Sequence, residues 1–164
     1  MNIFPEVMLA AFYRAFSRMQ PIDFYDWAAT NLQSLTASSM CITAFLLTGN
    51  GLASILYAVL FMANRLEMSR VTYTLPLREN FALPFWWLRA LFVTVLLQTN
   101  EPINFKARSH FAITMAVFLS TTLFCVTWQF SQFALLLDAL TFTLLHHIGL
   151  LTDDKVQLFI EAFI

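Results

Sequence analysis

Residues 28–63 decide the fold: they read AATNLQSLTASSMCITAFLLTGNGLASILYAVLFMA and contain no charged side chain. Gly49-Asn50-Gly51 interrupts this run with a strong turn signal. A helix needs roughly 20 apolar residues to cross a bilayer. The part of the run before the turn meets this length, and the part after the turn is short. We therefore predict two membrane-spanning helices, 28–48 and 52–66. The many Ser and Thr side chains of the first allow helices to approach closely, which places it inside a bundle.

Apolar runs of the same kind fill most of the remaining chain. The 164 residues are 59% hydrophobic and 12% charged, with a mean hydropathy of +0.69, whereas soluble domains are about 25% charged. The runs lack the alternation of barrel strands, and backbone groups inside a bilayer must be satisfied within the chain. The sequence thus predicts an all-α, polytopic transmembrane helical bundle. Its further predicted spans are 82–99, 111–127 and 130–151, and 156–164 starts another.

The segments between the spans fall on two sides of the membrane. Residues 1–27 are predicted to form an interfacial helix over Pro5–Arg18, too short to span, and then a turn. By parity this segment shares a side with the loop 67–81 and with a tight turn at Trp128-Gln129. The long loop of this side holds three basic residues, and the loops of the other side also hold three, so on this count the positive-inside rule does not choose between the two orientations. The six residues are Arg65, Arg70 and Arg78 against Lys106, Arg108 and Lys155.

The loop belongs to the most polar stretch of the chain, which reads RVTYTLPLRENFALPF over residues 70–85. Pro76 and Pro84 remove two backbone donors and discourage helix through 75–83. Its aromatic residues favour the depth of a membrane interface. Arginines held at a membrane face suit an anionic head group such as a lipid phosphate. A solvated connecting loop with interfacial anchors is the alternative interpretation.

Two charged residues interrupt predicted spans. Arg89 lies near one end of its span, and we expect its side chain to snorkel to the interface. Asp138 lies near the centre of its span, where a carboxylate is a functional candidate unless a neighbouring helix supplies a polar partner. A small transporter that uses Asp138 and Arg89 as an intramembrane polar pair is therefore one functional hypothesis.

The sequence predicts no metal, no cofactor and no nucleic-acid partner. Its formal net charge of -1 gives no reason to expect nucleic acid. Cys41 and Cys125 lie in apolar runs and read as buried thiols. The adjacent pair His146-His147 points in directions about 100° apart on a helix, so it cannot supply a two-ligand metal site alone.

Three motifs carry a resemblance to the protein C-mannosyltransferases, the dumpy-nineteen-like family. Residues 74–85, TLPLRENFALPF, resemble the luminal loop of that family. Residues 5–14, PEVMLAAFYR, are similar to its P-E-V-x-L-A-x-W-Y-R, and residues 128–133, WQFSQF, are similar to its P-W-Q-F-x-Q-F. The sequence departs from the family pattern at Phe12, Tyr73, Leu75, Asn80 and Thr127.

The resemblance implies a multi-pass protein of the endoplasmic reticulum membrane with part of a lipid-linked glycosyltransferase (GT-C-like) fold. It implies transfer of mannose from dolichyl phosphate mannose to tryptophan in W-x-x-W segments of secretory proteins, with residues 1–27 and 67–81 in the lumen. Arg78 is then the first candidate for binding the donor phosphate, Arg70 is the second, and Glu79 would orient Arg78. Supporting or substrate-binding roles fall to Trp128, Gln129, Glu6 and Arg14.

The catalytic residue stays unassigned, because the acidic residue proposed for this family lies upstream of the P-E-V helix. Glu6 is expected to be a helix-cap or structural residue. We therefore expect the chain to be a fragment of such an enzyme. A non-catalytic membrane protein derived from the family is the alternative.

The topology can be tested by glycosylation mapping. An N-glycosylation acceptor site placed near Ser17 of the full-length protein should be modified, because residues 1–27 are predicted to lie in the lumen. Absence of modification there, together with modification of a site beside Asn104, would reverse the predicted topology.

Overall fold

The structure is a computed structural model that describes residues 4–16, 18–64, 79–98, 108–153, 155–157 and 160. Within these ranges every long regular element is an α-helix, so the predicted all-α class is correct. The helices are α1 (Phe4–Phe16), α2 (Pro21–Thr48), α3 (Gly51–Ala63), α5 (Glu79–Gln98), α6 (Arg108–Thr127) and α7 (Ser131–His147).

Helix α2 is longer than the predicted span, because the segment 21–27 is helical and not a turn. Pro21 stands at the start of this helix, where its fixed φ suits the first turn and its missing N–H is not needed. Asp23 in the same turn complements the positive end of the helix dipole. The charged side chains of Asp23 and Asp26 therefore did not prevent helix formation. Of the predicted segment 1–27, residues 4–16 form α1 and residues 21–27 form the first turns of α2.

The turn between α2 and α3 lies where the sequence predicts it. Gly49 adopts a left-handed conformation with φ of 62°, and its N–H donates to the carbonyl of Phe45. Only glycine adopts this conformation readily, so α2 ends here. The side chain of Asn50 then accepts a 2.9 Å hydrogen bond from the N–H of Leu52 and caps α3.

Helix α5 begins earlier than the prolines of its sequence suggest. The predicted loop 67–81 lies outside the described residues up to residue 78, but 79–81 form the first turn of α5, and Pro84 lies inside the helix. The prediction of no helix through 75–83 is therefore wrong for 79–83. Near a helix start Pro84 leaves a single carbonyl without its helical donor, so its effect is local.

A tight turn separates α6 from α7, as predicted. The N–H of Trp128 donates to the carbonyl of Phe124 at 3.1 Å, and the N–H of Ser131 donates to the carbonyl of Trp128 at 3.3 Å. Helix α7 ends at His147, before the predicted boundary at 151, because Gly149 adopts φ of 75°. The N–H groups of Gly149 and Leu150 cap carbonyls of the last turn, as in a Schellman motif.

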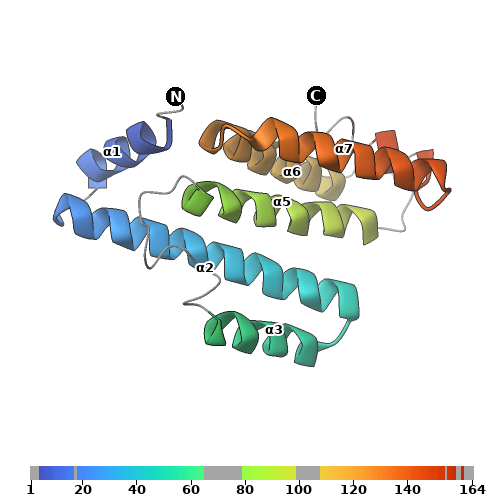
Figure 1. Cartoon of the computed structure of the whole chain (residues 1–164), viewed down its shortest axis with the longest axis horizontal. Coiled ribbons are helices and arrows are strands. Elements are labelled where there is room, and N and C mark those ends of the chain that lie inside the picture. Colours follow the sequence, from blue (N-terminus) through green and yellow to red (C-terminus); the bar gives the residue numbers. More distant parts are fainter. Residues whose placement is uncertain are drawn as a thin grey trace.

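Helix α5 lies at the centre of the bundle, between α2 on one side and α6 on the other (Figure 1). Helix α3 packs against the outer side of α2, and α7 runs beside α6. The small hydroxyl residues Thr36 and Ser39 of α2 are buried, which confirms that this helix packs inside the bundle. Val117 and Phe124 of α6 are buried almost completely and form the apolar core with α5.

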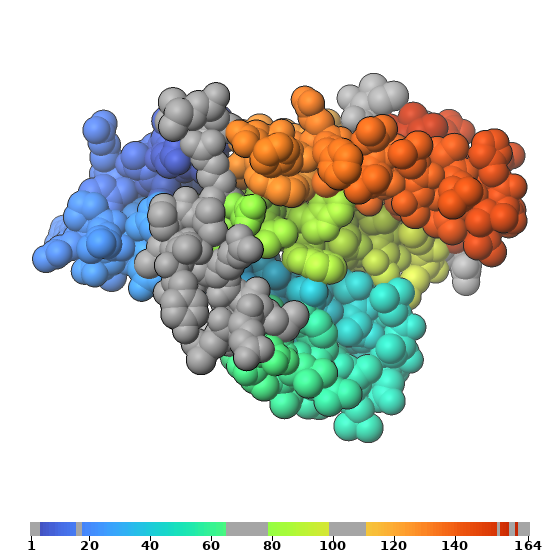
Figure 2. Space-filling view, in the orientation of Figure 1, coloured from blue at the N-terminus to red at the C-terminus, as the bar shows by residue number. Residues whose placement is uncertain are grey.

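The outer surface of the bundle is apolar. No residue of α3 is buried, and large apolar side chains such as Leu56 and Met62 point outward at 60% and 71% exposure. Helix α7, which covers the upper part of the view in Figure 2, exposes Phe133 and Leu140 in the same way. By length and hydropathy, α5 is the one helix of the described ranges that could cross a bilayer by itself.

Substitutions on α6 should distinguish its two faces. Phe124→Ala should destabilise the protein by about 3–5 kcal/mol, because it empties a site that is only 1% exposed. Phe118→Ala on the same helix is the matched control, since Phe118 is 43% exposed. Thermal unfolding of the full-length protein in detergent measures both, and equal losses would contradict this packing.

Candidate functional site

The predicted site residues that the structure describes gather at one end of the bundle. Arg70 and Arg78 lie outside the described residues. Glu79 is the first residue of α5, and Trp128 and Gln129 form the turn between α6 and α7. Because α6 runs antiparallel to α5 and α7, this turn lies at the same end as the start of α5 (Figure 1). We call this region the turn end.

Helix α1 completes the turn end, since it contacts both α6 and the first part of α2. Glu6 lies in the first turn of α1, where its carboxylate complements the helix dipole. Tyr25 of α2 packs edge-on against Phe81 of α5, with ring centroids 5.4 Å apart. Burial raises the pKa of the Tyr25 hydroxyl, and the negative charge of Glu6 raises that pKa further. Glu6 is therefore electrostatically coupled to the helix that packs on the start of α5.

Trp128 is held by a chain of aromatic contacts. Its ring lies 5.6 Å from that of Phe124, which in turn lies 4.9 Å from Trp86 of α5. On the other side Trp128 meets Phe130 edge-on at 5.9 Å. Such pairs add about 0.5–1.5 kcal/mol each beyond area burial. The half-buried Trp128 therefore fixes the turn to α5.

The turn end also carries polar side chains, of which Gln129 is more accessible than the packed ring of Trp128. Gln129 is exposed beside Trp128, and Glu79 is half-buried at the start of α5. Arg14 is also exposed, but it lies in the last turn of α1, the end of that helix that points away from the α6–α7 turn in Figure 1. These side chains are free to meet a ligand or another part of the protein, whereas Trp128 serves mainly to hold the turn in place.

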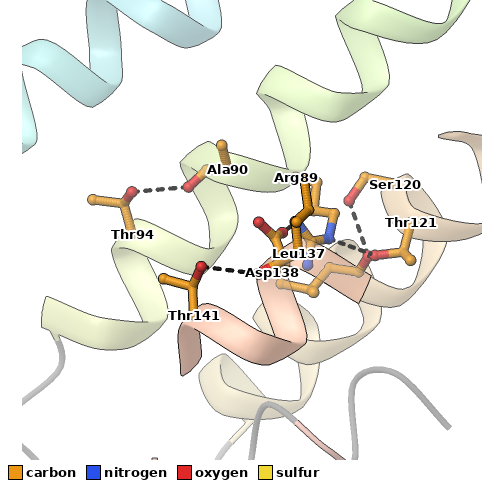
Figure 3. Close-up of polar contacts among 9 residues, drawn as sticks. Arg89, Ala90, Thr94, Ser120, Thr121, Leu137, Asp138 and Thr141 are labelled. Atoms are coloured by element: carbon orange, nitrogen blue, oxygen red, sulfur yellow. Dashed lines mark hydrogen bonds and ion pairs between the residues drawn. The ribbon is translucent and has the colours of Figure 1, made fainter. Parts of the chain in front are cut away.

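An ion pair between Arg89 and Asp138 lies inside the bundle, the pair that the transporter hypothesis names. The Nη1 of Arg89 donates to the Oδ2 of Asp138 at 2.5 Å, and its Nε donates to the Oγ1 of Thr121 at 3.2 Å (Figure 3). Its guanidinium also lies 5.1 Å from the centre of the Trp86 ring, a cation–π distance. Arg89 is 2% exposed, so the prediction that it snorkels is wrong.

The physical reason is that α6 and α7 supply acceptors for Arg89. A guanidinium has five N–H donors, and here carboxylate, hydroxyl and ring are all within reach inside the bundle. The Oγ1 of Thr121 also donates to the carbonyl of Val117, so the hydroxyl bridges Arg89 to the α6 backbone. The sequence makes Asp138 a functional candidate unless a neighbouring helix supplies a polar partner. Arg89 of α5 is such a partner. The pair joins α5, α6 and α7.

The described residues hold no group of three His, Cys, Asp or Glu side chains close enough to bind a metal ion. Cys41 and Cys125 are free, half-buried thiols. His146 lies near the exposed carboxylate of Asp153, with 3.6 Å between its Nε2 and the Oδ1, and His147 is its ring neighbour. His146 and His147 stand in the last turn of α7, at the opposite end of that helix from the turn end.

The molecule is thus an all-helical protein with an apolar exterior and a polar site at one end. The family model described as Dpy19, Q-cell neuroblast polarisation, matches residues 1–164. The chain is 29% identical over its whole length to "Probable C-mannosyltransferase DPY19L4" of Mus musculus and 30% identical over 95% of its length to the Homo sapiens protein of the same name. It is 28% identical over 95% of its length to "Protein C-mannosyl-transferase DPY19L1" of Mus musculus.

The chain therefore belongs to the Dpy19 family. It covers 23%, 21% and 24% of the lengths of those three relatives, respectively. The names of the relatives support a glycosyltransferase role at the level of the family.

The ion pair can be tested by a double-mutant cycle. Breaking a buried pair by removing one partner costs about 3–5 kcal/mol, because the other charge stays buried without compensation. Asp138→Leu should cost more than Arg89→Met, since the Arg89 side chain is 3% exposed and that of Asp138 is 27% exposed. The double variant should recover much of the loss.

The measurement is thermal unfolding of full-length protein in detergent. Thr122→Val, at an exposed hydroxyl of α6 next to Thr121, is a control that should change little. If the double variant lost the sum of the two single losses, the two residues would not act as a pair.

Proposed function

We propose that this chain is part of a C-mannosyltransferase that takes mannose from dolichyl phosphate mannose and attaches it to tryptophan in W-x-x-W segments of secretory proteins. The observation that carries the proposal is the family match over residues 1–164 together with relatives named as C-mannosyltransferases. The fold adds support, because the three family-like segments meet at one end of the bundle: α1, the start of α5 and the α6–α7 turn.

The apolar exterior supports a place in a membrane. A monomer in water rarely exposes large contiguous apolar patches, yet α3, α6 and α7 all turn large apolar side chains outward. Hydroxyl and charged groups such as Ser39, Arg89 and Ser120 are buried instead. This distribution suits helices surrounded by lipid, and we propose a polytopic protein of the endoplasmic reticulum membrane with a GT-C-like fold and the turn end in the lumen.

The donor site that we propose uses the arginines before α5. When the bond between mannose and phosphate breaks, negative charge develops on the leaving lipid phosphate. A guanidinium held there stabilises the transition state more than the ground state. Arg78 directly precedes Glu79, the first residue of α5, in the sequence, and we propose that Glu79 orients it. Arg70 is the second candidate.

The start of α5 itself favours an anion. The first N–H groups of a helix have no partner within the helix, and the dipole places partial positive charge there. Gln129 and Glu6, also at the turn end, are candidates for contacts to the sugar or to the acceptor. The catalytic base stays unassigned in this chain.

The Asp138–Arg89 pair that the transporter alternative names is present, and Arg89 also bonds to Thr121 of α6. Because these contacts hold α5, α6 and α7 together, a structural role accounts for the pair, and its presence is no argument for transport by itself. The non-catalytic alternative remains, and the activity of the full-length protein decides it.

Mannose transfer to a W-x-x-W peptide by the full-length protein tests the proposal. Arg78→Ala should lower the rate roughly a hundredfold, about 3 kcal/mol, because it removes a charge-assisted contact that tightens in the transition state. Arg78→Lys should also be poor, since an ammonium cannot grip two phosphate oxygens as a planar guanidinium does.

Arg65→Ala is the matched control, because it removes the same charge nearby in the sequence without an assigned role. Near-normal transfer by Arg78→Ala at normal expression would remove Arg78 from the donor site. Absence of transfer by the unmodified full-length protein would favour the non-catalytic alternative.

A further inference from the structure

An open groove lies between α1 and the first half of α2, with a volume of about 750 Å³. Apolar side chains make up most of its lining, with Arg18 and Asn31 as the polar members. Its volume falls within the roughly 300–1,000 Å³ of sites that bind small molecules. Its lining residues on α2 are Phe24, Trp27, Ala28, Asn31, Leu32 and Leu35.

These six residues follow the spacing of one helix face, so the groove runs along α2 for about three turns. Leu9 and Phe12 of α1 form the opposite wall. Phe12 and Trp27 are each 55% exposed, which leaves two large aromatic side chains of the groove uncovered. In Figure 1 the two helices diverge from their connection at Arg18–Gln20, so the groove lies in the angle between them.

The connection between α1 and α2 is fixed by specific contacts. The hydroxyl of Tyr13 donates to the carbonyl of Met19 at 2.9 Å, and its ring packs at 5.3 Å from that of Phe24. Arg18 directly precedes Met19 and lies at the margin of the groove. Its side chain is exposed, and within the described part of the chain it makes no ion pair.

A ligand in the interior of the groove needs few polar groups, because the lining is mostly apolar. The side-chain amide of Asn31 already donates to the carbonyl of Trp27 at 2.7 Å. A ligand that fits this arrangement has a long apolar part for the groove and one anionic group for Arg18 at its margin. A guanidinium binds carboxylate or phosphate oxygens with two parallel hydrogen bonds, and phosphate is the anionic group that every glycerophospholipid carries.

We propose that the groove between α1 and α2 binds a glycerophospholipid of the bilayer, with one acyl chain along α2 and its phosphate at Arg18. This site rests on the membrane location given under Proposed function. Since that section assigns the phosphate of the sugar donor to the arginines before α5, the groove lipid is a separate, resident molecule. It covers Phe12 and Trp27 and holds α1 against α2.

Native mass spectrometry of the full-length protein, purified in a mild detergent, tests the site after incubation with phosphatidylglycerol. The unmodified protein should retain phosphatidylglycerol through a detergent wash. Arg18→Gln should lower the retained fraction about tenfold, as expected for the loss of one charge-assisted phosphate contact. Asn31→Trp should lower it as much, because the new ring fills the groove from an exposed position.

Two matched controls lie on the same helices. Arg14→Gln removes an exposed charge of α1 that does not line the groove, and Ser34→Trp adds a ring at an exposed position of α2 outside it. Both should retain the lipid. If Arg14→Gln and Arg18→Gln lowered the retained fraction of lipid equally, surface charge alone would explain the effect. That result would contradict the proposed site.

Two other outcomes also overturn the proposal. One is retention of lipid by Asn31→Trp at the level of the unmodified protein. The other is displacement of phosphatidylglycerol by an equal concentration of a polyprenyl phosphate, which would assign the groove to the lipid of a sugar donor. Because the readout is bound lipid and not mannose transfer, its failure is distinguishable from a failure of the proposed function.

Discussion

The ion pair between Arg89 and Asp138 is the contact on which the arrangement of α5, α6 and α7 depends. An isolated charge in an apolar interior is costly, so Arg89 is compatible with the bundle only where an acceptor meets it. Asp138 on α7 and Thr121 on α6 meet it from two directions. Because these acceptors lie on different helices, the requirement fixes how α6 and α7 are placed along α5.

That placement determines where the turn end lies. Trp86 stacks near the Arg89 guanidinium and also contacts Phe124, which contacts Trp128. A continuous set of contacts therefore runs from the ion pair to the turn between α6 and α7. A polar site at the end of the bundle needs such support, because its exposed residues, such as Gln129, have few packing contacts of their own.

The distribution of polar and apolar groups differs from that of a soluble helical protein. Small hydroxyl residues occupy the interfaces of α2 and α6 with α5, where they let the helices approach closely. Some hydroxyls of the bundle, such as those of Thr94 on α5 and Ser120 on α6, donate to carbonyls one turn earlier in their own helix. The hydroxyls of Thr36, Ser39 and Thr114 are buried without a hydrogen-bond partner among the described residues.

The sequence by itself determined the features that depend on local chemistry. Gly49 ended α2 where the sequence predicts it, because glycine adopts positive φ without steric cost. Gly149 ended α7 for the same reason, although the predicted span continued to 151. The break at Trp128-Gln129 was also predictable, as a polar interruption between two uncharged runs. The three family motifs likewise gave a set of candidate residues from the sequence alone.

Only the tertiary structure decided the features that depend on what lies beside a helix. Whether Arg89 reaches the interface or stays buried depends on an acceptor 49 residues away, and no local pattern contains that distance. Pro76 and Pro84 argued against helix over 79–83, yet these residues form the start of α5, which packs between α2 and α6. The groove at Arg18 exists because α1 and α2 diverge, which again follows from contacts between segments and not from the sequence of either one.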